Sequence, residues 1–563
     1  MERFGRYDAI HRRGDKRYLK LRIEKGRYMM NTMKKIIAVA MGFTLVAAAL
    51  AMSGCGDSSS SKNAEATDFT FTSYPMETDV TLTYWTALNT NVAALSEDLN
   101  QTPFAEELKA QTGVDVQFIH PPVGQEADQL NILLASENLP DIIENNWYSF
   151  SGGPQKALDD GFILDLTDII PEHSPNLYKY LQANPETDKM IKTDDNRYYV
   201  YPFIKGDEKL LVVQGLVVRQ DWLDELGLEM PETIDEWHNV LTQFKERKGA
   251  EAPLTYQANM LLKGDFIGAF GITRDFTVEN GKVIYGPADP RYRDFLETFA
   301  QWYQEGLIDS NIANVDSKAQ DANILNGKSG VSFGFAGSNL GRWMQALQAS
   351  DPNAELVAAP HLSRVKGERP KIGQKDVPYS TSGSVAITTS CRNVELAARF
   401  LDYGYSEAGH MLYNFGKESK SYNMIDGYPT YTDYILNNEN GLSVGAAMGQ
   451  YIRGNQCGPF VQAREYIEQY YNTPQQMAAL EIWADSDMAS YSLPKVTFTP
   501  EESSEVANIA NNINTYVDEM TARYIMGLED LSTFDTYMGR LKTFRIDRLL
   551  ELYQGAYERY MKR

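Results

Sequence analysis

The sequence predicts an α/β fold built on a parallel sheet, and the segment 80–118 provides the main reasons. Apolar residues alternate with polar ones at 80–84 and again at 114–118, which is the pattern of half-buried strands. The stretch 104–112 between them has helical spacing and stops at Gly113. A helix that joins two strands through short links indicates that the strands are parallel neighbours in one sheet.

Two longer helices are predicted further along the chain from their N-terminal capping boxes. One opens at 233–236 and ends near Gly249, and the other opens at 499–502 and ends near Gly527. Each carries an apolar stripe that we expect to pack against the body of the protein. The stripes consist of Trp237, Val240, Leu241 and Phe244 in the first helix, and of Val506, Ile509, Ile513, Val517, Met520 and Tyr524 in the second.

Length and composition describe a folded, acidic chain. Its 563 residues are 43% hydrophobic and 23% charged, which suits roughly two to four structural units with sizeable cores. The 53 Lys+Arg against 76 Asp+Glu give a formal charge of −23, so we expect no nucleic-acid partner for the folded part. Cys55, Cys391 and Cys457 are too few for a disulfide scaffold or a zinc site, and we expect no metal and no cofactor.

The N-terminal region has the form of an export signal. Met33 and two lysines precede 17 uncharged, mostly apolar residues at 36–52. We predict a signal peptide at 33–54 rather than a retained transmembrane anchor, because an anchor needs roughly 20 apolar residues. The basic stretch 1–32 has no evident export role, and we predict that it is a non-native extension ahead of a true start at Met33.

The sequence around Cys55 resembles the lipobox of bacterial lipoproteins, in which the chain is cut before a cysteine that carries diacylglycerol. Ser53 and Gly54 match that box, and Met52 stands where Leu is usual. The resemblance implies lipid attachment at Cys55, and two acyl chains would hold the protein firmly to a membrane. The Ser-rich part of 55–77 is typical of a flexible tether. We therefore expect an extracytoplasmic protein that is lipid-anchored to the cell membrane.

Three short motif matches lack the context that their chemistry requires. The phosphate-loop match at 322–329 precedes a predicted strand at 331–335 instead of following one. The nucleophile-elbow match at 441–445 follows a polar stretch, and all six histidines come before Ser443, whereas the hydrolase order places one after the serine. Residues 194–196 lack the other ligands of a calcium loop and are predicted to form a polar turn.

A glycoside hydrolase stays open as an alternative function. Such an enzyme needs only two carboxylates at a suitable separation in space, and the sequence neither excludes nor singles out such a pair. We therefore set a non-catalytic capture protein against a secreted surface glycosidase. An assay for new reducing ends on a panel of glycans would separate the two.

Seven segments, in this order, resemble the extracellular solute-binding proteins of ABC transporters, family 1, and in particular the large LipO-like lipoprotein branch. They are 139–143, 161–167, 197–202, 219–228 with 231–233, 327–331, 393–397 and 413–416. The resemblance implies a type II periplasmic-binding-protein-like fold, with two α/β lobes, a hinge and a ligand cleft between them. It implies a small-molecule ligand, most commonly an oligosaccharide, that is delivered to separate permease subunits. We expect a monomer and not an enzyme.

The resemblance also implies lobes that are discontinuous in sequence, with crossings of the hinge near 201–213, 356–361 and Phe415. The first lobe is then expected at 78–205 and 359–414, and the second at 206–358 and 415–563.

Candidate ligand contacts follow the predicted strands, because ligands of open α/β sheets bind beyond the C-terminal ends of the strands. Trp85 and Trp147 are favoured, since a Trp in a polar loop has less reason to pack in the core than one on an amphipathic helix. Aromatic faces also suit the apolar faces of sugars. The candidates are Trp85, Asn89, Asn145, Asn146, Trp147, Gly337, Ser338, Trp343, Tyr413, Asn414 and Phe415.

Overall fold

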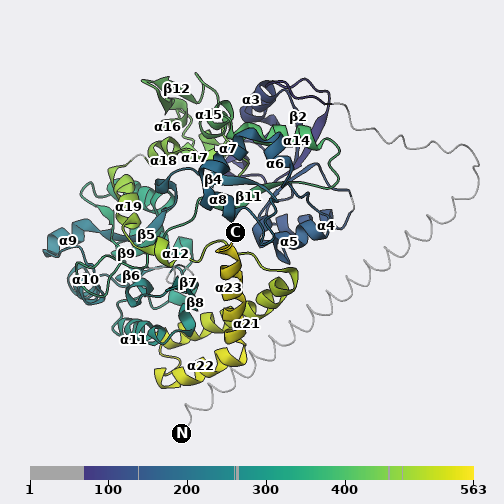
Figure 1. The fold of residues 1–563 in the computed structure, drawn as a ribbon. Helices are drawn as coiled ribbons and strands as arrows, with labels where there is room; N and C mark the ends of the chain where they lie inside the picture. Colours follow the sequence, from purple (N-terminus) through teal and green to yellow (C-terminus); the bar gives the residue numbers. More distant parts are fainter. Residues whose placement is uncertain (1–68, 137, 259, 261–264, 454–456, 472) are drawn as a thin grey trace, which may run out of the picture. The chain divides into compact units, whose positions relative to one another are not determined.

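The structure is a computed structural model that describes residues 69–136, 138–258, 260, 265–453, 457–471 and 473–563 (Figure 1). The predicted extension 1–32, the signal peptide 33–54, Cys55 and most of the tether lie outside the described residues. Within the described part of the chain, no helix is long and apolar enough to span a membrane.

Six strands form the first sheet, in the order β14-β4-β11-β3-β1-β2. Their bounds are β1 (Thr81–Trp85), β2 (Asp115–Ile119), β3 (Ile142–Asn145), β4 (Tyr201–Lys205), β11 (Tyr379–Ile387) and β14 (Val461–Gln462). β1 is parallel to β2, and α3 (Pro103–Thr112) lies between them in the chain, so the predicted strand-helix-strand unit is confirmed. The sheet is mixed rather than wholly parallel, because β11 runs antiparallel between β3 and β4.

Gly113 ends α3 as predicted, and the backbone there requires a glycine. Its φ is 77°, in the left-handed region that other residues rarely adopt. A Cβ at this position would also come within 2.1 Å of the carbonyl oxygen of Met76. The turn therefore brings the chain ahead of β1 close to the end of α3.

Four strands form the second sheet, in the order β10-β5-β9-β6. They are β5 (Gln214–Arg219), β6 (Leu254–Thr255), β9 (Val331–Phe335) and β10 (Leu356–Ala358). β9 occupies the residues predicted for it, and α12 (Ser317–Leu325) precedes it. The phosphate-loop match at 322–329 thus connects a helix to a strand, the reverse of the order that phosphate binding needs.

Both predicted capping boxes are present. α10 (Ile234–Lys248) begins with Thr233 accepting from the backbone N–H of Glu236, while Glu236 accepts from that of Thr233. α21 (Pro500–Ile525) begins in the same way at Thr499 and Glu502. Satisfying the free N–H groups of a helix start stabilises it by about 1 kcal/mol. The predicted apolar residues of both helices are buried.

Eighteen other α-helices and two β-hairpins complete the described fold. The helices are α2 (Thr90–Ala93), α4 (Glu126–Leu134), α5 (Gly153–Asp159), α6 (Ile169–His173), α7 (Pro175–Ala183), α8 (Pro185–Met190), α9 (Gln220–Leu226), α11 (Arg291–Gln304), α13 (Arg342–Gln348), α14 (Val394–Asp402), α15 (Glu407–Phe415), α16 (Asp433–Leu436), α17 (Val444–Met448), α18 (Arg464–Tyr470), α19 (Pro474–Ala484), α20 (Met488–Tyr491), and the C-terminal pair α22 (Phe534–Thr543) and α23 (Ile546–Tyr560). The hairpins pair β7 (Phe276–Glu279) with β8 (Lys282–Tyr285), and β12 (Tyr422–Ile425) with β13 (Tyr428–Tyr431).

The buried side chains form three apolar cores. The first surrounds the first sheet and includes Leu82 and Ile142. The second lies under α10, α11 and the C-terminal helices α21, α22 and α23, which Figure 1 shows packed together, and includes Trp237. The third includes Trp343 and Phe415 and joins one side of the second sheet to residues of α15, α18 and α19.

The chain passes between the two sheets more than once. It leaves the first sheet after β4, enters the second at β5, and returns from β10 to β11. Residues 415–563 were predicted to belong to the second lobe. Within this range, however, β14 pairs with β4 and adds an edge strand to the first sheet. Val496 and Tyr560 also pack in the first core. The exact lobe boundaries stay a prediction.

Candidate functional site

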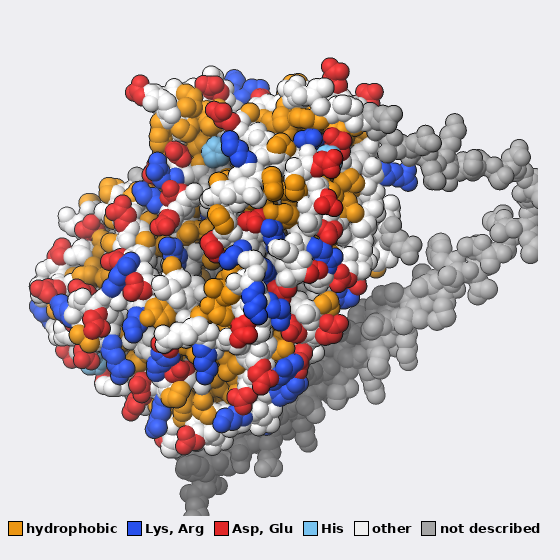
Figure 2. All heavy atoms as spheres, in the orientation of Figure 1, with side chains coloured by type: hydrophobic (Ala, Val, Ile, Leu, Met, Phe, Trp, Pro, Cys, Tyr) orange, Lys and Arg blue, Asp and Glu red, His pale blue; other side chains and the backbone are white. Residues whose placement is uncertain are grey.

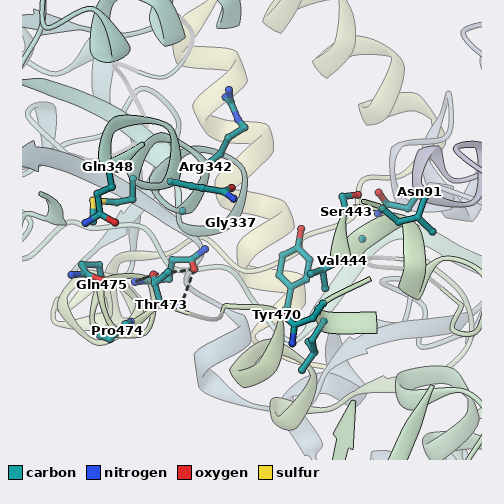
Figure 3. Close-up of a pocket in the computed structure, with 18 residues that line it drawn as sticks. Asn91, Gly337, Arg342, Gln348, Ser443, Val444, Tyr470, Thr473, Pro474 and Gln475 are labelled. Atoms are coloured by element: carbon teal, nitrogen blue, oxygen red, sulfur yellow. Dashed lines mark hydrogen bonds between the residues drawn. The ribbon is translucent and has the colours of Figure 1, made fainter. Parts of the chain in front are cut away.

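A cavity of about 830 Å³ lies where α2, α13, the α16–α17 region and the α18–α19 region meet (Figure 3). We call it the main cavity. Its volume falls within the ~300–1,000 Å³ of ordinary small-molecule sites. It is lined by Asn91, Gly337, Gly341, Arg342, Met344, Gln345, Gln348, Leu436, Asn437, Leu442, Ser443, Val444, Gly445, Tyr470, Thr473, Pro474, Gln475 and Gln476.

The main cavity is lined by residues that follow strands of both sheets in the chain. Asn91 sits on α2, which follows β1 of the first sheet, and Gly337 follows β9 of the second sheet. Ligands of α/β sheets bind beyond the C-terminal ends of the strands. The position therefore supports a ligand that contacts residues attached to both sheets.

Tyr470 provides an aromatic face at the centre of the main cavity. In Figure 3 its ring stands between the segments that carry Gly337 and Ser443. It stacks on Tyr466 with ring centroids 5.7 Å apart, and it contacts Tyr471 at 5.5 Å. A Cβ on Gly337 would come within 3.1 Å of the Tyr470 ring and 3.0 Å of the Tyr471 ring. The glycine thus lets the tyrosines close over the end of β9.

Most of the other polar groups around the main cavity are neutral amides and hydroxyls. Gln476 donates to the carbonyl oxygen of Ala336 at 2.9 Å and caps α19, so its amide has a structural role. By contrast, the side-chain amides of Asn91 and Gln345 make no hydrogen bond to any other described residue. They are therefore available to hydroxyl groups of a ligand.

Arg342 is the one charged residue in the described lining of the main cavity, and its charge is compensated. Its guanidinium lies 2.6 Å from Asp321, which also accepts from the indole N–H of Trp343 at 2.7 Å. Burial opposes ionisation of Asp321, but these donors outweigh it and hold the pKa of Asp321 below its ordinary value. The main cavity therefore presents close to zero net charge.

A buried polar network closes the ends of β1 and β3. Arg453 forms an ion pair with Glu144, and both side chains are under 5% exposed. Tyr84 donates to Glu144 at 2.7 Å, and Arg453 also lies 3.3 Å from the hydroxyl of Thr86. Burial disfavours the charged form of Arg453, but Glu144 more than compensates and raises its pKa well above the ordinary value. This network has the character of a structural clamp rather than an open site.

Cys457 belongs to the same clamp as a neutral thiol. Its sulfur lies 3.5 Å from the guanidinium of Arg453, and burial raises the pKa of the thiol to about 12. Neither Cys457 nor Cys391 forms a disulfide. A thiol that stays protonated is a poor nucleophile, so Cys457 offers no reactive centre.

The residues of the nucleophile-elbow and calcium-loop matches have ordinary structural roles. Ser443 caps α17 by accepting from the backbone N–H of Ala446. Asp194 pairs with Arg559 at 2.5 Å and with Arg563, while Asn196 adopts a left-handed turn with φ of 69°. Among the described residues, no group of three or more His, Cys, Asp and Glu side chains could hold a metal ion.

Only Gly337 among the predicted contacts lines the main cavity. Ser338 is exposed beside it, and Asn89 caps α2 just ahead of Asn91. Asn145 lies in the β3–β11 pairing opposite Ser384, and Asn146 caps the short helix 147–149. Whether these residues contact a ligand stays a prediction.

The expectation that Trp85 and Trp147 stand clear of the core is wrong. Trp147 is fully buried, because its indole N–H turns back to the carbonyl oxygen of Ile143 at 3.1 Å and its ring packs on Phe150. Trp85 is 6% exposed, within the first core. A polar loop sequence does not prevent an indole from folding onto the strand that precedes it.

The remaining candidates are also buried in this structure. Trp343 is fully covered in the third core, where Phe415 joins it, and Tyr413 packs in the first core. Asn414 donates to the carbonyl oxygen of Val461 and accepts from the backbone N–H of Ala463. These bonds attach α15 to β14, so Asn414 has a structural role at the edge of the first sheet.

Asn91, Gln345 and Tyr470 line the main cavity but were not predicted from the sequence. Asn91 lies two residues beyond a predicted contact, in an Asn-Thr-Asn run after β1 that could have been noticed. Tyr470 lies in a Tyr-Tyr pair at the end of a helix, and a pair of this kind is also common in cores. Gln345 carries no signal in the sequence.

The family model of the bacterial extracellular solute-binding proteins matches residues 93–411. Among curated proteins, the chain is 25% identical over 551 residues to the fructooligosaccharide ABC transporter substrate-binding protein FusA of Streptococcus pneumoniae, covering 92% of this chain and 97% of FusA. It is 26% identical over 369 residues to Lipoprotein LipO of Bacillus subtilis, covering 62% of this chain and 70% of LipO.

Among solved structures, the fold is similar to the alginate-binding protein AlgQ2 without calcium ion. The TM-score is 0.68 at 23% identity, and the match covers 85% of this chain and 98% of AlgQ2. FusA in complex with kestose matches with a TM-score of 0.67 at 22% identity, over 86% of this chain and all of FusA. The predicted two-lobe, type II periplasmic-binding-protein-like fold is thereby confirmed.

Proposed function

Since the chain belongs to the bacterial extracellular solute-binding proteins, we propose that it captures a neutral oligosaccharide in the main cavity and delivers it to the permease of an ABC importer. The family and the relatives are substrate-binding proteins, so the chain is not an enzyme. The surface glycosidase considered from the sequence is therefore set aside.

One observation carries the proposal: the main cavity joins residues attached to both sheets and offers one tyrosine face, free amides and almost no net charge. Tyrosine stacks on the apolar face of a sugar ring, while amides of Asn91 and Gln345 can both donate to and accept from hydroxyls. FusA is named for fructooligosaccharides, which are neutral. A neutral sugar fits this lining better than a charged peptide or a nucleotide.

The charge of the lining also favours a neutral over an acidic oligosaccharide. AlgQ2 is named as alginate-binding, and alginate is a polymer of uronic acids. A uronate needs uncompensated cations, but the only cation in the described lining, Arg342, is already paired with Asp321. Binding an acid here would require breaking that pair.

Delivery rests on closure of the two lobes about the segments that cross between the sheets. The segments that connect the two sheets are 206–213, between β4 and β5, and 359–378, between β10 and β11, and we propose a third crossing near Phe415. A hinge of this kind gives permease subunits a closed, loaded form to recognise. The partners of the protein are then a sugar and the permease, with no second copy of the chain required.

The anchor is proposed from the sequence and from the name of one relative, Lipoprotein LipO. Cys55 would carry the lipid and hold the protein on the outer face of the cell membrane. Changing Cys55 to Ser should release the protein from the membrane fraction or block its processing, while Cys391→Ser should leave its location unchanged. A Cys55→Ser protein that is processed and still sediments with membranes would contradict the anchor.

A ligand screen by thermal unfolding tests the proposed function. Sucrose, kestose, nystose, raffinose, stachyose and maltotriose form the neutral set, with trigalacturonate and a tetrapeptide as competitors. A ligand at a hundred times its dissociation constant raises the free energy of unfolding by about 2.7 kcal/mol. We expect a shift with at least one neutral sugar and none with the competitors.

Asn91→Ala provides the matched variant for the screen. The side-chain amide of Asn91 makes no hydrogen bond to any other described residue. Its loss should therefore lower the affinity for the sugar several-fold and leave the stability of the protein unchanged. Asn353→Ala is the control, because Asn353 is exposed and lies outside the main cavity. A shift with the peptide alone, or equal affinities for both variants, would refute the assignment of the main cavity to a neutral sugar.

A further inference from the structure

A second cavity, of about 630 Å³, adjoins the main one. We call it the outer cavity; it is lined by Asp433, Tyr434, Asn437, Asn438, Glu439 and Asn440. Asn437 lines both cavities, so they meet at the end of α16. Together they exceed the ~1,000 Å³ at the upper end of ordinary small-molecule sites. The combined space suits an extended ligand rather than a compact one.

Tyr434 presents a partly exposed aromatic ring in the outer cavity. It is 41% exposed. Its ring is nevertheless held in place, because it meets the edge of Tyr451 with centroids 5.8 Å apart and planes at 84°. Asn438 also donates to the Tyr434 carbonyl oxygen at 2.8 Å. A ring that is supported by a neighbour and partly exposed can stack on a ligand at little cost in conformational entropy.

The polar groups beside Tyr434 match sugar hydroxyls and repel acids. The side-chain amide of Asn440 makes no hydrogen bond to any other described residue. Asp433 accepts from Asn437 at 3.3 Å and keeps further lone pairs free. Asp433 and Glu439 together make the outer cavity negative, so hydroxyl donors are favoured and carboxylates disfavoured.

We propose that the outer cavity is a subsite for the distal units of a neutral oligosaccharide whose first units occupy the main cavity, with Tyr434 as its stacking platform. This inference rests on the proposed function and extends it from the class of ligand to its length. Longer members of a series should bind more tightly than short ones, and the gain should depend on the Tyr434 ring.

Calorimetric titration of the full chain with sugar series of increasing length tests the subsite. The series are sucrose, kestose and nystose; sucrose, raffinose and stachyose; and maltose, maltotriose and maltotetraose. In the unchanged protein, the tetrasaccharide of the bound series should bind about tenfold more tightly than the disaccharide. Tyr434→Ala should remove that gain and leave the disaccharide affinity unchanged, whereas Tyr434→Phe should retain it.

Ile425→Ala serves as the control, since Ile425 is 52% exposed on the nearby β12–β13 hairpin and lines neither cavity. It should retain the full gain with length. Equal affinities for short and long sugars, or a gain that survives in Tyr434→Ala, would overturn the subsite while leaving the proposed function in place. If no neutral sugar binds, the proposed function fails and the subsite fails with it.

Discussion

The strands of the two sheets end in different surroundings. In the first sheet, the ends of β1 and β3 are covered by the clamp of Tyr84, Glu144 and Arg453, all buried. In the second, β9 ends at Phe335 and is followed by Gly337, which lines the main cavity together with Tyr470. The C-terminal end of a strand can therefore be covered by stabilising contacts or left open to a ligand. The polar contacts around that end determine which of the two occurs.

The surface gives a second contrast. On the face shown in Figure 2, basic and acidic side chains alternate without a broad region of one sign. Many ion pairs in the described part of the chain join exposed side chains, such as Lys328 with Glu251 at 45% and 70% side-chain exposure. Exposed pairs contribute about 0–1 kcal/mol each, so the clamp, and not the surface, is where charge matters for stability.

The largest expected effect is the loss of one partner of the clamp. Glu144→Ala leaves the Arg453 charge buried without a counter-charge, and the free energy of unfolding should fall by about 3–5 kcal/mol. Denaturant unfolding followed by circular dichroism measures it. Glu251→Ala is the control for an exposed pair and should cost under about 1 kcal/mol. Equal losses in the two variants would refute the distinction between clamp and surface.

Trp147→Ala should act on stability rather than on binding. Truncating a fully buried Trp typically costs about 3–5 kcal/mol, because it leaves a cavity and loses contacts. The sugar affinity of the folded fraction should stay within twofold of the unchanged protein, about 0.4 kcal/mol. A large loss of affinity at nearly unchanged stability would return Trp147 to the ligand site and reverse the assignment made from its burial.

Tyr470→Ala should show the opposite pattern, since its ring is partly exposed in the main cavity. Loss of an aromatic stacking platform weakens binding by about 1–3 kcal/mol. Titration with the bound sugar measures this, and thermal unfolding of the empty protein checks stability. Tyr466→Phe, which keeps the ring below Tyr470, should bind normally. Unchanged affinity in Tyr470→Ala would refute the proposal that the sugar binds in the main cavity.

Gly337→Ala should give the smallest effect. The added Cβ lies 3.0–3.1 Å from the rings of Tyr470 and Tyr471, so the rings must shift by a few tenths of an ångström, and we expect affinity to fall by under about tenfold. Gly539→Ala on α22 meets nothing within 4 Å and should instead stabilise the helix by about 0.5–1 kcal/mol. An affinity loss in Gly539→Ala alone would contradict this account.

Local patterns predicted much of the fold because each depends on a few neighbouring residues. The unit of β1, α3 and β2, both capping boxes and the strand 331–335 all follow from spacing within one turn or strand. β11 makes the first sheet mixed, and no local sequence pattern shows that it runs antiparallel to its neighbours. β14 is two residues long and pairs with β4, more than 250 residues earlier in the chain, and no short pattern encodes such a partner.

The candidate site was predicted less well than the fold, again for a physical reason. The rule that ligands bind beyond strand ends selected two segments that border the main cavity, since Gly337 lines this cavity and Asn89 precedes Asn91 in the chain. It could not show that the ends of β1 and β3 are closed, because Arg453 reaches Glu144 from 309 residues away. Exposure depends on such distant contacts, and composition around Trp147 does not reveal them.

The late position of β14 and α23 in the chain has a consequence for the order of folding. The first core needs residues from both ends of the described chain, since Leu82 and Tyr560 belong to it. Contacts between distant residues form slowly, and this core lacks its last members until Tyr560 has been synthesised. Until then the first core stays incomplete, which suits the export proposed here, because a translocation channel that threads extended polypeptide accepts only a chain that has not yet closed its cores.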